Sequence, residues 1–282
     1  MAERAVAVVT DSTSDIPQEL AAMHDITVIP LLVNAGDRTF ADGDLTQAEF
    51  FELMASSSKL PTTSTPAVGA FDAAFRAALQ TAPSVLAIHI SEKLSGTIET
   101  SRQAAAAFGD KVRVFDSKNL SWGEGFQVLE AARAAAAGAG IDEVVRVAER
   151  TRERVRMIVG VDKLDNLAKG GRIGAVSAFL GGLLNLKVTF TVDSEGKFEP
   201  VARTRGTKAA LEHTVEWVRT QMGERTRGAF CVMHAMSAGN AAWLKDRLES
   251  TFSVAEMHVV DVGVVISTHT GTGWGVAVVP LD

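Results

Sequence analysis

Short apolar segments alternate along this chain with longer segments that carry helix signals. The first apolar segment covers residues 5–9 and leads through a polar turn to Pro17, where a helix is predicted to begin. Residues 85–90 form another apolar segment, and Ser95 then marks the start of a helix predicted to run to about residue 108. Strands that are apolar on both faces are typical of a parallel sheet covered by helices on both sides. The fold class is therefore predicted to be α/β with mostly parallel sheets.

The same alternation restarts in the second half of the chain. A helix is predicted over residues 142–156, and its charged outer face is interpreted as a solvated, ion-paired surface. At about 150 residues per typical domain, the 282 residues suggest two α/β lobes, 1–156 and 157–282. In the second lobe, strands are predicted over 157–161, 188–192, 198–203, 230–234, 257–261, 262–267 and 276–279, and helices over 176–186, 208–222 and 240–252.

Charge, cysteine content and hydropathy exclude several classes of protein. The formal net charge is −6, which argues against a protein that binds nucleic acid through a basic surface. The single cysteine, Cys231, cannot form an internal disulfide, which favours a reducing, cytoplasmic location. No secretory signal is predicted, and no segment reaches the ~20 apolar residues of a membrane-spanning helix. The six histidines form no ligand-like pair, so no metal site is predicted.

Two clusters of hydroxyl side chains lie directly before predicted helices. Residues 61–66 read Pro-Thr-Thr-Ser-Thr-Pro, and residues 95–97 read Ser-Gly-Thr. Hydroxyls and free N–H groups at the positive end of a helix can hold an anion without a nearby cation. The alternative interpretation is ordinary capping of the two helices by Ser and Thr.

A third cluster is rich in glycine and covers residues 269–275, which are expected to form a turn between the strands predicted over 262–267 and 276–279. Glycines allow a turn to approach a ligand closely. The imidazole of His269 could donate a hydrogen bond to an anion or transfer a proton. The alternative is a histidine that merely lies at the surface.

Five segments, taken together, resemble those of the DegV family and occur in the order found in that family. They extend from residue 10 to residue 273, so the resemblance covers essentially the whole chain. The segments are TDSTSD at 10–15, PTTS at 61–64, LSGT at 94–97, GGRI at 170–173 and THTGTG at 268–273.

This resemblance implies a two-lobed protein that binds one long-chain fatty acid in a tunnel at the domain interface. Family members of the FakB type carry the fatty acid for a bacterial fatty acid kinase. They present the carboxylate to a separate ATP-dependent kinase subunit and carry the acyl phosphate to an acyltransferase of phospholipid synthesis. The resemblance therefore implies a lipid-binding carrier rather than an enzyme, with no cofactor, no nucleic acid partner and at most transient contact with a membrane.

The resemblance also implies which residues hold the carboxylate. In relatives of this type the contacts come from a Thr of the PTTS segment, the Ser of LSGT and the His of the HTG segment. The matching positions are Thr63, Ser95 and His269. Thr62 and Gly96 lie beside them and are further candidates for ligand contact.

The resemblance also implies that the GGRI segment takes part in docking of the kinase subunit. Its arginine corresponds to Arg172, and Gly170 and Gly171 resemble an exposed backbone nest suited to phosphate or a partner carboxylate. Arg205 is a second candidate for contact with an anion. Apolar side chains that could line the slot for the tail, or simply belong to the core, are Phe179, Leu180, Leu183, Leu184 and Leu186.

An enzyme of a different class is the main alternative. Ser95 could act as the nucleophile and His269 as the base of an acyl hydrolase or acyltransferase. Ser95 does not lie in the G-x-S-x-G sequence of α/β-hydrolases, and no acidic third member is identifiable. The chain also contains no G-x-x-x-x-G-K-[ST] loop, which argues against phosphorylation by this chain itself.

Overall fold

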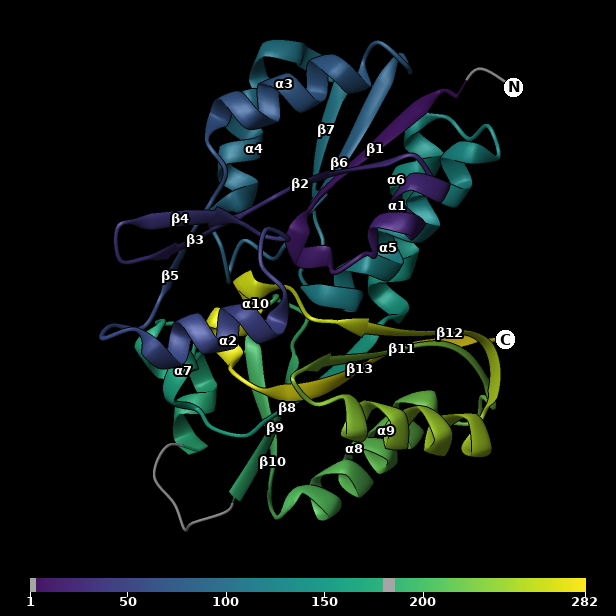
Figure 1. Cartoon of the computed structure of the whole chain (residues 1–282). Coiled ribbons are helices and arrows are strands. Elements are labelled where there is room, and N and C mark those ends of the chain that lie inside the picture. The colour runs from purple at the N-terminus through teal and green to yellow at the C-terminus, as the bar shows by residue number, and fades with distance from the viewer. Residues whose placement is uncertain (1–3, 180–185) are drawn as a thin grey trace. The chain divides into compact units, whose positions relative to one another are not determined.

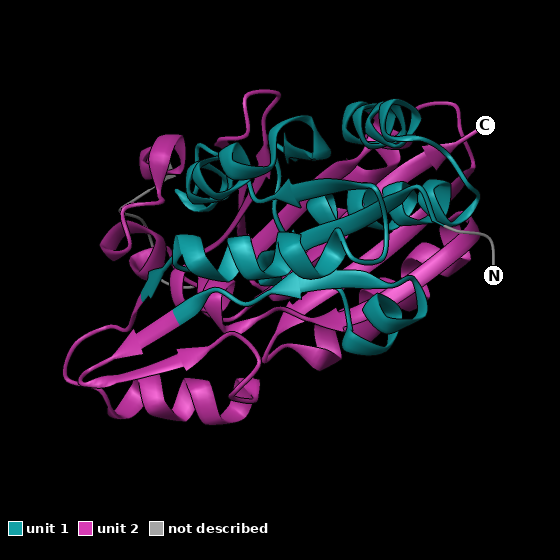
Figure 2. Ribbon diagram, turned by 90° about the horizontal axis from the view of Figure 1, so that it is seen from above, with its two compact units in different colours: residues 1–32, 63–153 teal, residues 33–62, 154–282 magenta. Residues whose placement is uncertain are grey.

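A computed structural model describes residues 4–179 and 186–282 (Figure 1). The chain forms two compact units (Figure 2). Unit 1 comprises Met1–Leu32 and Thr63–Glu153, and unit 2 comprises Val33–Thr62 and Arg154–Asp282. The domains 1–156 and 157–282 stay a prediction. The compact units differ from them because residues 33–62 group with the C-terminal half of the chain.

Unit 1 is built around a four-stranded sheet with the strand order β2-β1-β6-β7. Every pairing in this sheet is parallel, as predicted for the first lobe. Its strands are β1 (Val6–Asp11), β2 (Ile26–Ile29), β6 (Ser84–His89) and β7 (Val112–Asp116); its helices are α1 (Gln18–Met23), α3 (Val68–Ala78), α4 (Thr97–Ala105), α5 (Ser121–Ala136) and α6 (Ile141–Arg154); and η1 (Ser12–Ser14) and η2 (Ala106–Lys111) are 3-10 turns.

Helices cover both faces of the unit 1 sheet. Val8 and Leu86 belong to a buried cluster with residues of α1, α5 and α6. Val9 and Ala87 belong to a second cluster, with residues of α3 and α4. Successive residues of a strand point to opposite faces, so a strand covered on both sides is apolar along its whole length. This is the physical reason for the uninterrupted apolar segments in the first half of the sequence.

Unit 2 contains a six-stranded sheet with the order β10-β9-β8-β13-β11-β12. Helices α8 and α9 pack on one face of it, in a buried cluster that includes Trp274 and Phe230. The strands are β8 (Arg156–Val161), β9 (Leu186–Val192), β10 (Phe198–Arg205), β11 (Arg227–Ala235), β12 (Ser253–Asp261) and β13 (Gly273–Leu281); the helices are α7 (Asp165–Lys169), α8 (Thr207–Met222), α9 (Ala238–Thr251) and α10 (Val264–Thr270); and η3 (Gly174–Phe179) is a 3-10 turn.

The α/β class is confirmed, but the prediction of a mostly parallel sheet was wrong for unit 2. Only the pairing of β11 with β12 is parallel, and the other four pairings are antiparallel. A short turn at 193–196 joins β9 to β10, and a connection this short can only produce an antiparallel hairpin. Strand β13, near the end of the chain, lies between β8 and β11 and runs antiparallel to both.

One predicted element of unit 2 was wrong, and a second is described only in part. Residues 262–267, predicted as a strand, contribute most of helix α10. The predicted helix 176–186 overlaps η3 at its start and β9 at Leu186, and residues 180–185 lie outside the described part of the chain. The candidate tail-lining residues Leu180, Leu183 and Leu184 therefore lie outside it too, as does the side chain of Phe179.

Residues 33–62 contain a small sheet and one helix. The sheet has the order β4-β3-β5, and its strands are β3 (Leu32–Ala35), β4 (Arg38–Ala41) and β5 (Thr62–Ser64). Helix α2 (Gln47–Ser56) begins directly after its N-cap, Thr46. The Thr46 hydroxyl accepts from the Glu49 backbone N–H, and the Glu49 carboxylate accepts from the Thr46 N–H at 2.9 Å, which is a capping box.

Candidate ligand-binding site

The two hydroxyl clusters predicted from the sequence lie close together, and Thr63 and Ser95 both belong to unit 1. Thr63 is half-buried in β5, and its neighbour Thr62 is exposed. Ser95 is half-buried in the loop between β6 and α4, and Gly96 precedes the first residue of that helix. A Cβ placed on Gly96 would lie 3.9 Å from the Thr65 methyl group, which is ordinary van der Waals contact. The structure thus brings the segments 61–66 and 95–97 together.

Local hydrogen bonds hold the Ser95 hydroxyl at the start of α4. Its Oγ lies 2.9 Å from the Thr97 Oγ1 and accepts from the Thr97 backbone N–H at 3.3 Å. The Ser95 backbone N–H donates to the Ser91 carbonyl, which closes the turn before the helix. A hydroxyl fixed at the N-terminal end of a nine-residue helix is suited to contact with an anion.

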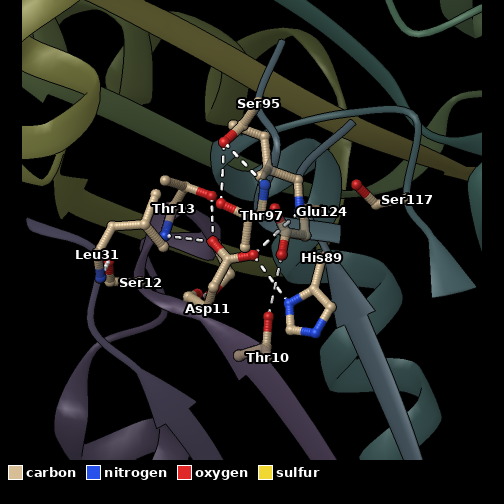
Figure 3. Close-up of polar contacts among 12 residues, drawn as sticks. Thr10, Asp11, Ser12, Thr13, Leu31, His89, Ser95, Thr97, Ser117 and Glu124 are labelled. Carbon is tan, nitrogen blue, oxygen red and sulfur yellow. Dashed lines mark hydrogen bonds and ion pairs between the residues drawn. The ribbon is translucent and has the colours of Figure 1, made fainter. Parts of the chain in front are cut away.

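A buried polar network lies near these hydroxyls, at the ends of β1 and β6 (Figure 3). The Asp11 carboxylate, fully buried, accepts from the Ile90 backbone N–H at 3.1 Å and lies 3.0 Å from the His89 Nδ1. It also accepts from the backbone N–H and the hydroxyl of Thr13. Asp11 therefore fixes the turn after β1 and the start of the loop that leads to Ser95. These hydrogen bonds give Asp11 the role of a turn residue.

Glu124, on α5, lies in the same network. Its Oε1 accepts from the Thr10 hydroxyl at 3.0 Å, and its Oε2 has no hydrogen-bond partner. Burial, together with the nearby carboxylate of Asp11, raises the pKa of Glu124 well above its ordinary value. The sequence offered no indication of this residue, because an acidic residue in a helix is normally exposed.

The Glu124 side chain leads to a prediction on stability. The free energy of unfolding is expected to fall as the pH rises above 4.5, because the unfolded chain then loses a proton that folded Glu124 keeps. The slope is at most about 1.4 kcal/mol per pH unit and ends at the raised folded-state pKa. Glu124→Gln keeps the oxygen that accepts from Thr10 and cannot ionise, so it should remove this contribution. Urea denaturation between about pH 5 and pH 8 measures the difference.

The matched control is Glu130→Gln on the same helix, since this side chain is partly exposed and pairs with Arg133 at 2.6 Å. It should leave the pH dependence of wild-type stability unchanged. Identical slopes for wild type and Glu124→Gln would contradict a protonated carboxyl at this position.

In unit 2, the structure brings His269 together with the GGRI segment. His269 lies in the last turn of α10, not in a turn between strands as predicted. Gly170 directly follows α7, and a Cβ placed on it would lie 2.4 Å from the His269 Nδ1. Burial, and to a smaller degree the positive charge of Arg172, lower the pKa of His269 to about 4. His269 is therefore a neutral imidazole at pH 7.

The backbone of the GGRI segment does not form the predicted open nest. The N–H groups of Gly170, Gly171 and Arg172 donate to carbonyls of α7, at 2.8, 3.2 and 3.1 Å respectively. Gly171 has a φ of 71°, so this segment is a helix C-cap of the kind that glycine favours. The exposed Arg172 side chain donates to the Gly170 carbonyl at 2.8 Å. Contact of these three residues with a partner stays a prediction.

Arg205 lies exposed at the end of β10, opposite Leu186 in the β9–β10 pairing. Its role as an anion contact stays a prediction. The sequence reading missed Asp162, whose carboxylate contacts the Lys187 Nζ at 2.6 Å and accepts from the Thr272 hydroxyl at 2.7 Å. These contacts tie the start of β13, close to His269, to β8 and β9.

A Ser–His pair of the kind a hydrolase needs is not assembled in the described part of unit 1. The Ser95 hydroxyl bonds to Thr97 rather than to an imidazole. His89 contacts Asp11 through Nδ1, but its buried Nε2 has no hydrogen-bond partner. Among residues 4–179 and 186–282, no three side chains of His, Cys, Asp or Glu are placed to hold a metal ion. None of the described helices is long and apolar enough to cross a membrane.

Comparison with known proteins relates the whole chain to one family. The model of the family described as "Uncharacterised protein, DegV family" matches residues 5–281. A DegV domain-containing protein of Deinococcus radiodurans is 37% identical over 284 residues, which cover 98% of this chain and 99% of the relative. A DegV domain-containing protein of Streptococcus pneumoniae is 34% identical over 277 residues, which cover 97% of this chain and 98% of the relative.

Two solved structures are similar over nearly their full lengths. The first is a DegV family protein from Thermus thermophilus, described for its fatty acid binding. It is 36% identical, with a TM-score of 0.93, and the match covers 98% of this chain and 100% of the Thermus thermophilus chain. The second is DegV of Bacillus subtilis, described as a fatty acid binding protein. It is 30% identical, with a TM-score of 0.88, and the match covers 99% of this chain and 100% of the Bacillus subtilis chain.

Proposed function

The chain belongs to the DegV family, and from this premise we propose that it binds a long-chain fatty acid. The observation that carries the proposal is the similarity to the Thermus thermophilus protein, which is described for its fatty acid binding and matches 98% of this chain. The protein then acts as a carrier without a cofactor. A cytoplasmic location and a tunnel for the tail stay predictions.

The carboxylate is held by neutral hydrogen-bond donors. Thr63 and Ser95 supply hydroxyls, with Thr62 and Gly96 adjacent to them, and His269 supplies an imidazole N–H. The placement of Ser95 at the start of α4 and the low pKa of His269, about 4, support these roles. Donors without a full charge leave the carboxylate oxygens negative and able to attack phosphate, which a buried arginine clamp would oppose.

Burial of the tail supplies most of the affinity. Each buried methylene is worth ~0.8 kcal/mol, so a chain of about fifteen contributes on the order of 12 kcal/mol before the costs of binding are subtracted. Hydrogen bonds to a charged group add about 1.5–3 kcal/mol each and fix which end of the ligand is presented. The head contacts therefore set orientation and reactivity more than total affinity.

The finer role is that of the lipid-carrying subunit of a fatty acid kinase. The bound carboxylate is presented to a separate ATP-dependent subunit, and the acyl phosphate is then carried to an acyltransferase of phospholipid synthesis. The resemblance of the five sequence segments supports this role. The exposed Arg172, beside the half-buried His269, is a suitable contact for the kinase subunit.

Extraction of the purified protein with organic solvent, followed by mass spectrometry, tests the proposal. We expect one long-chain fatty acid per chain. Incubation with the kinase subunit and ATP should then convert the bound acid to its acyl phosphate. An empty protein that turns over model esters, with turnover lost in Ser95→Ala, would instead support the hydrolase.

Arg172→Ala is expected to separate lipid binding from kinase docking. Fatty-acid affinity should stay within about twofold, because the side chain is exposed and donates to the carbonyl of Gly170 in its own segment. Acyl phosphate formation with the kinase subunit should fall roughly tenfold. The pKa of His269 should rise, because the positive charge of Arg172 helps to lower it. Titration calorimetry, a phosphorylation assay and NMR of the imidazole measure the three effects.

Arg219→Ala is the matched control, because Arg219 is also exposed and pairs with a neighbour on its own helix, Glu216. It should change none of the three quantities. Loss of lipid binding in Arg172→Ala would place Arg172 in the binding pocket and remove it as a docking residue.

A further inference from the structure

The segment 33–62 contributes two polar side chains that bond to the backbone of distant parts of unit 2. These side chains are Asp42, which follows β4, and Gln47, the first residue of α2. Their partners lie 187–223 residues later in the chain, at the end of β11 and around the start of α10. Neither residue belongs to a motif that the sequence singled out.

Asp42 caps the helix that carries His269. Its Oδ1 accepts from the backbone N–H groups of Val264 at 2.9 Å and Val265 at 3.4 Å, the first two residues of α10. The residue at the N-cap position is Gly263, which has no side chain to do this. A helix of seven residues is marginal by itself, so a cap at its first turn affects the whole helix.

Gln47 fixes the loop that enters α10. Its Nε2 donates to the His234 carbonyl at 2.8 Å and to the Val262 carbonyl at 2.9 Å, and its Oε1 accepts from the Met236 N–H at 2.7 Å. Three hydrogen bonds thus join this amide to the end of β11 and to the residue before Gly263. The start of α10 is thereby held from two sides by the same segment.

The other end of α10 has little freedom. His269 lies five residues after Val264, about 7.5 Å along the helix axis. Its ring packs so closely against Gly170 that a methyl group there would lie 2.4 Å from Nδ1. Any shift of the first turn along the axis would therefore displace the imidazole.

We propose that Asp42 and Gln47 are positioning residues for His269, acting through the backbone of α10. The segment 33–62 then serves to set the place of one carboxylate donor. This inference rests on the proposed function only in giving His269 a role in ligand binding.

Asp42→Ala tests the inference with two measurements. Affinity for a fluorescent fatty acid should weaken roughly fivefold, the effect of losing one helix cap. The His269 imidazole, followed by NMR in the protein freed of lipid, should titrate closer to 6.5 than to 4, because a displaced ring becomes more exposed. Asp42→Asn keeps an oxygen acceptor at the same place and should restore both properties. Asp37→Ala, an exposed aspartate of the same segment, is the control and should behave as wild type.

Unchanged imidazole titration in Asp42→Ala would overturn the inference, whether or not fatty acid binds. If Asp42→Asn changes fatty-acid affinity and the His269 titration as much as Asp42→Ala does, the capping hydrogen bond is not the cause of these changes. Should Asp42→Ala fail to fold, Asp42→Glu shifts the carboxylate by one methylene, and the same titration decides. Absence of fatty acid from the wild-type protein would refute the proposed function alone, because the NMR measurement needs no lipid.

Discussion

A protein with both Thr63 and Ser95 replaced by alanine is expected to lose its fatty acid during purification. Each hydroxyl is proposed to donate to the carboxylate, and a hydrogen bond to a charged group is worth about 1.5–3 kcal/mol. Loss of both should weaken binding roughly a hundredfold or more. Acyl phosphate formation should fall in parallel, because the carboxylate would no longer be held for reaction. Mass spectrometry of the extracted lipid and displacement of a fluorescent fatty acid measure the first effect.

The control is a second pair of a threonine and a serine. Thr220 and Ser250 are exposed on α8 and α9, and their hydroxyls bond to carbonyls of their own helices. Replacing both by alanine should leave lipid retention unchanged. If the Thr63/Ser95 double variant retains fatty acid as wild type does, neither hydroxyl holds the carboxylate and the proposed head site is wrong.

Gly170→Ala is expected to have the second large effect. The added methyl group would lie 2.4 Å from the His269 Nδ1, 3.2 Å from the Cε1 and 3.0 Å from the Asn166 carbonyl oxygen. Either the imidazole or the C-cap of α7 must move, at a cost of about 1–3 kcal/mol. We expect fatty-acid affinity to fall roughly tenfold or more, because the imidazole would no longer point at the carboxylate.

A double-mutant cycle with His269→Ala identifies the cause. His269→Ala removes the closest contact of the new methyl group and leaves the 3.0 Å contact with the Asn166 carbonyl, so Gly170→Ala should cost less affinity in that background than in wild type. Gly239→Ala is the control, because Gly239 lies on an exposed turn of α9 and a Cβ added there would meet no neighbouring atom within 4 Å. It should leave fatty-acid affinity unchanged. Additive losses in the cycle would show that the two residues act independently.

Features that depend on local sequence signals were predicted well. The strands around Val8 and Leu86 are buried on both faces, so their composition alone indicates a covered parallel sheet. Thr46 and Glu49 form the capping box that their spacing predicts. The hydroxyl segments 61–66 and 95–97 also lie together, since a Cβ on Gly96 would lie 3.9 Å from the Thr65 methyl group.

Features that depend on distant contacts could not be predicted. The run Val264–Val265–Ile266 has the β-branched composition of a strand, and it is a helix because Asp42 caps it and the core buries it. The strand order of unit 2 depends on where β13 inserts, which no local pattern records. Gly170 and Gly171 were read as an anion nest, whereas their N–H groups complete the end of α7.

The bonds of Gln47 and Asp42 also have a consequence for biosynthesis. Gln47 leaves the ribosome 187 residues before His234, and Asp42 leaves it 222 residues before Val264. The full set of these bonds in unit 2 can thus form only after translation has passed Val264, and the segment 33–62 remains without it until then. Nascent chains halted before Val262 would lack the backbone partners of Asp42 and one of those of Gln47, and such incompletely bonded intermediates are the species that chaperones recognise.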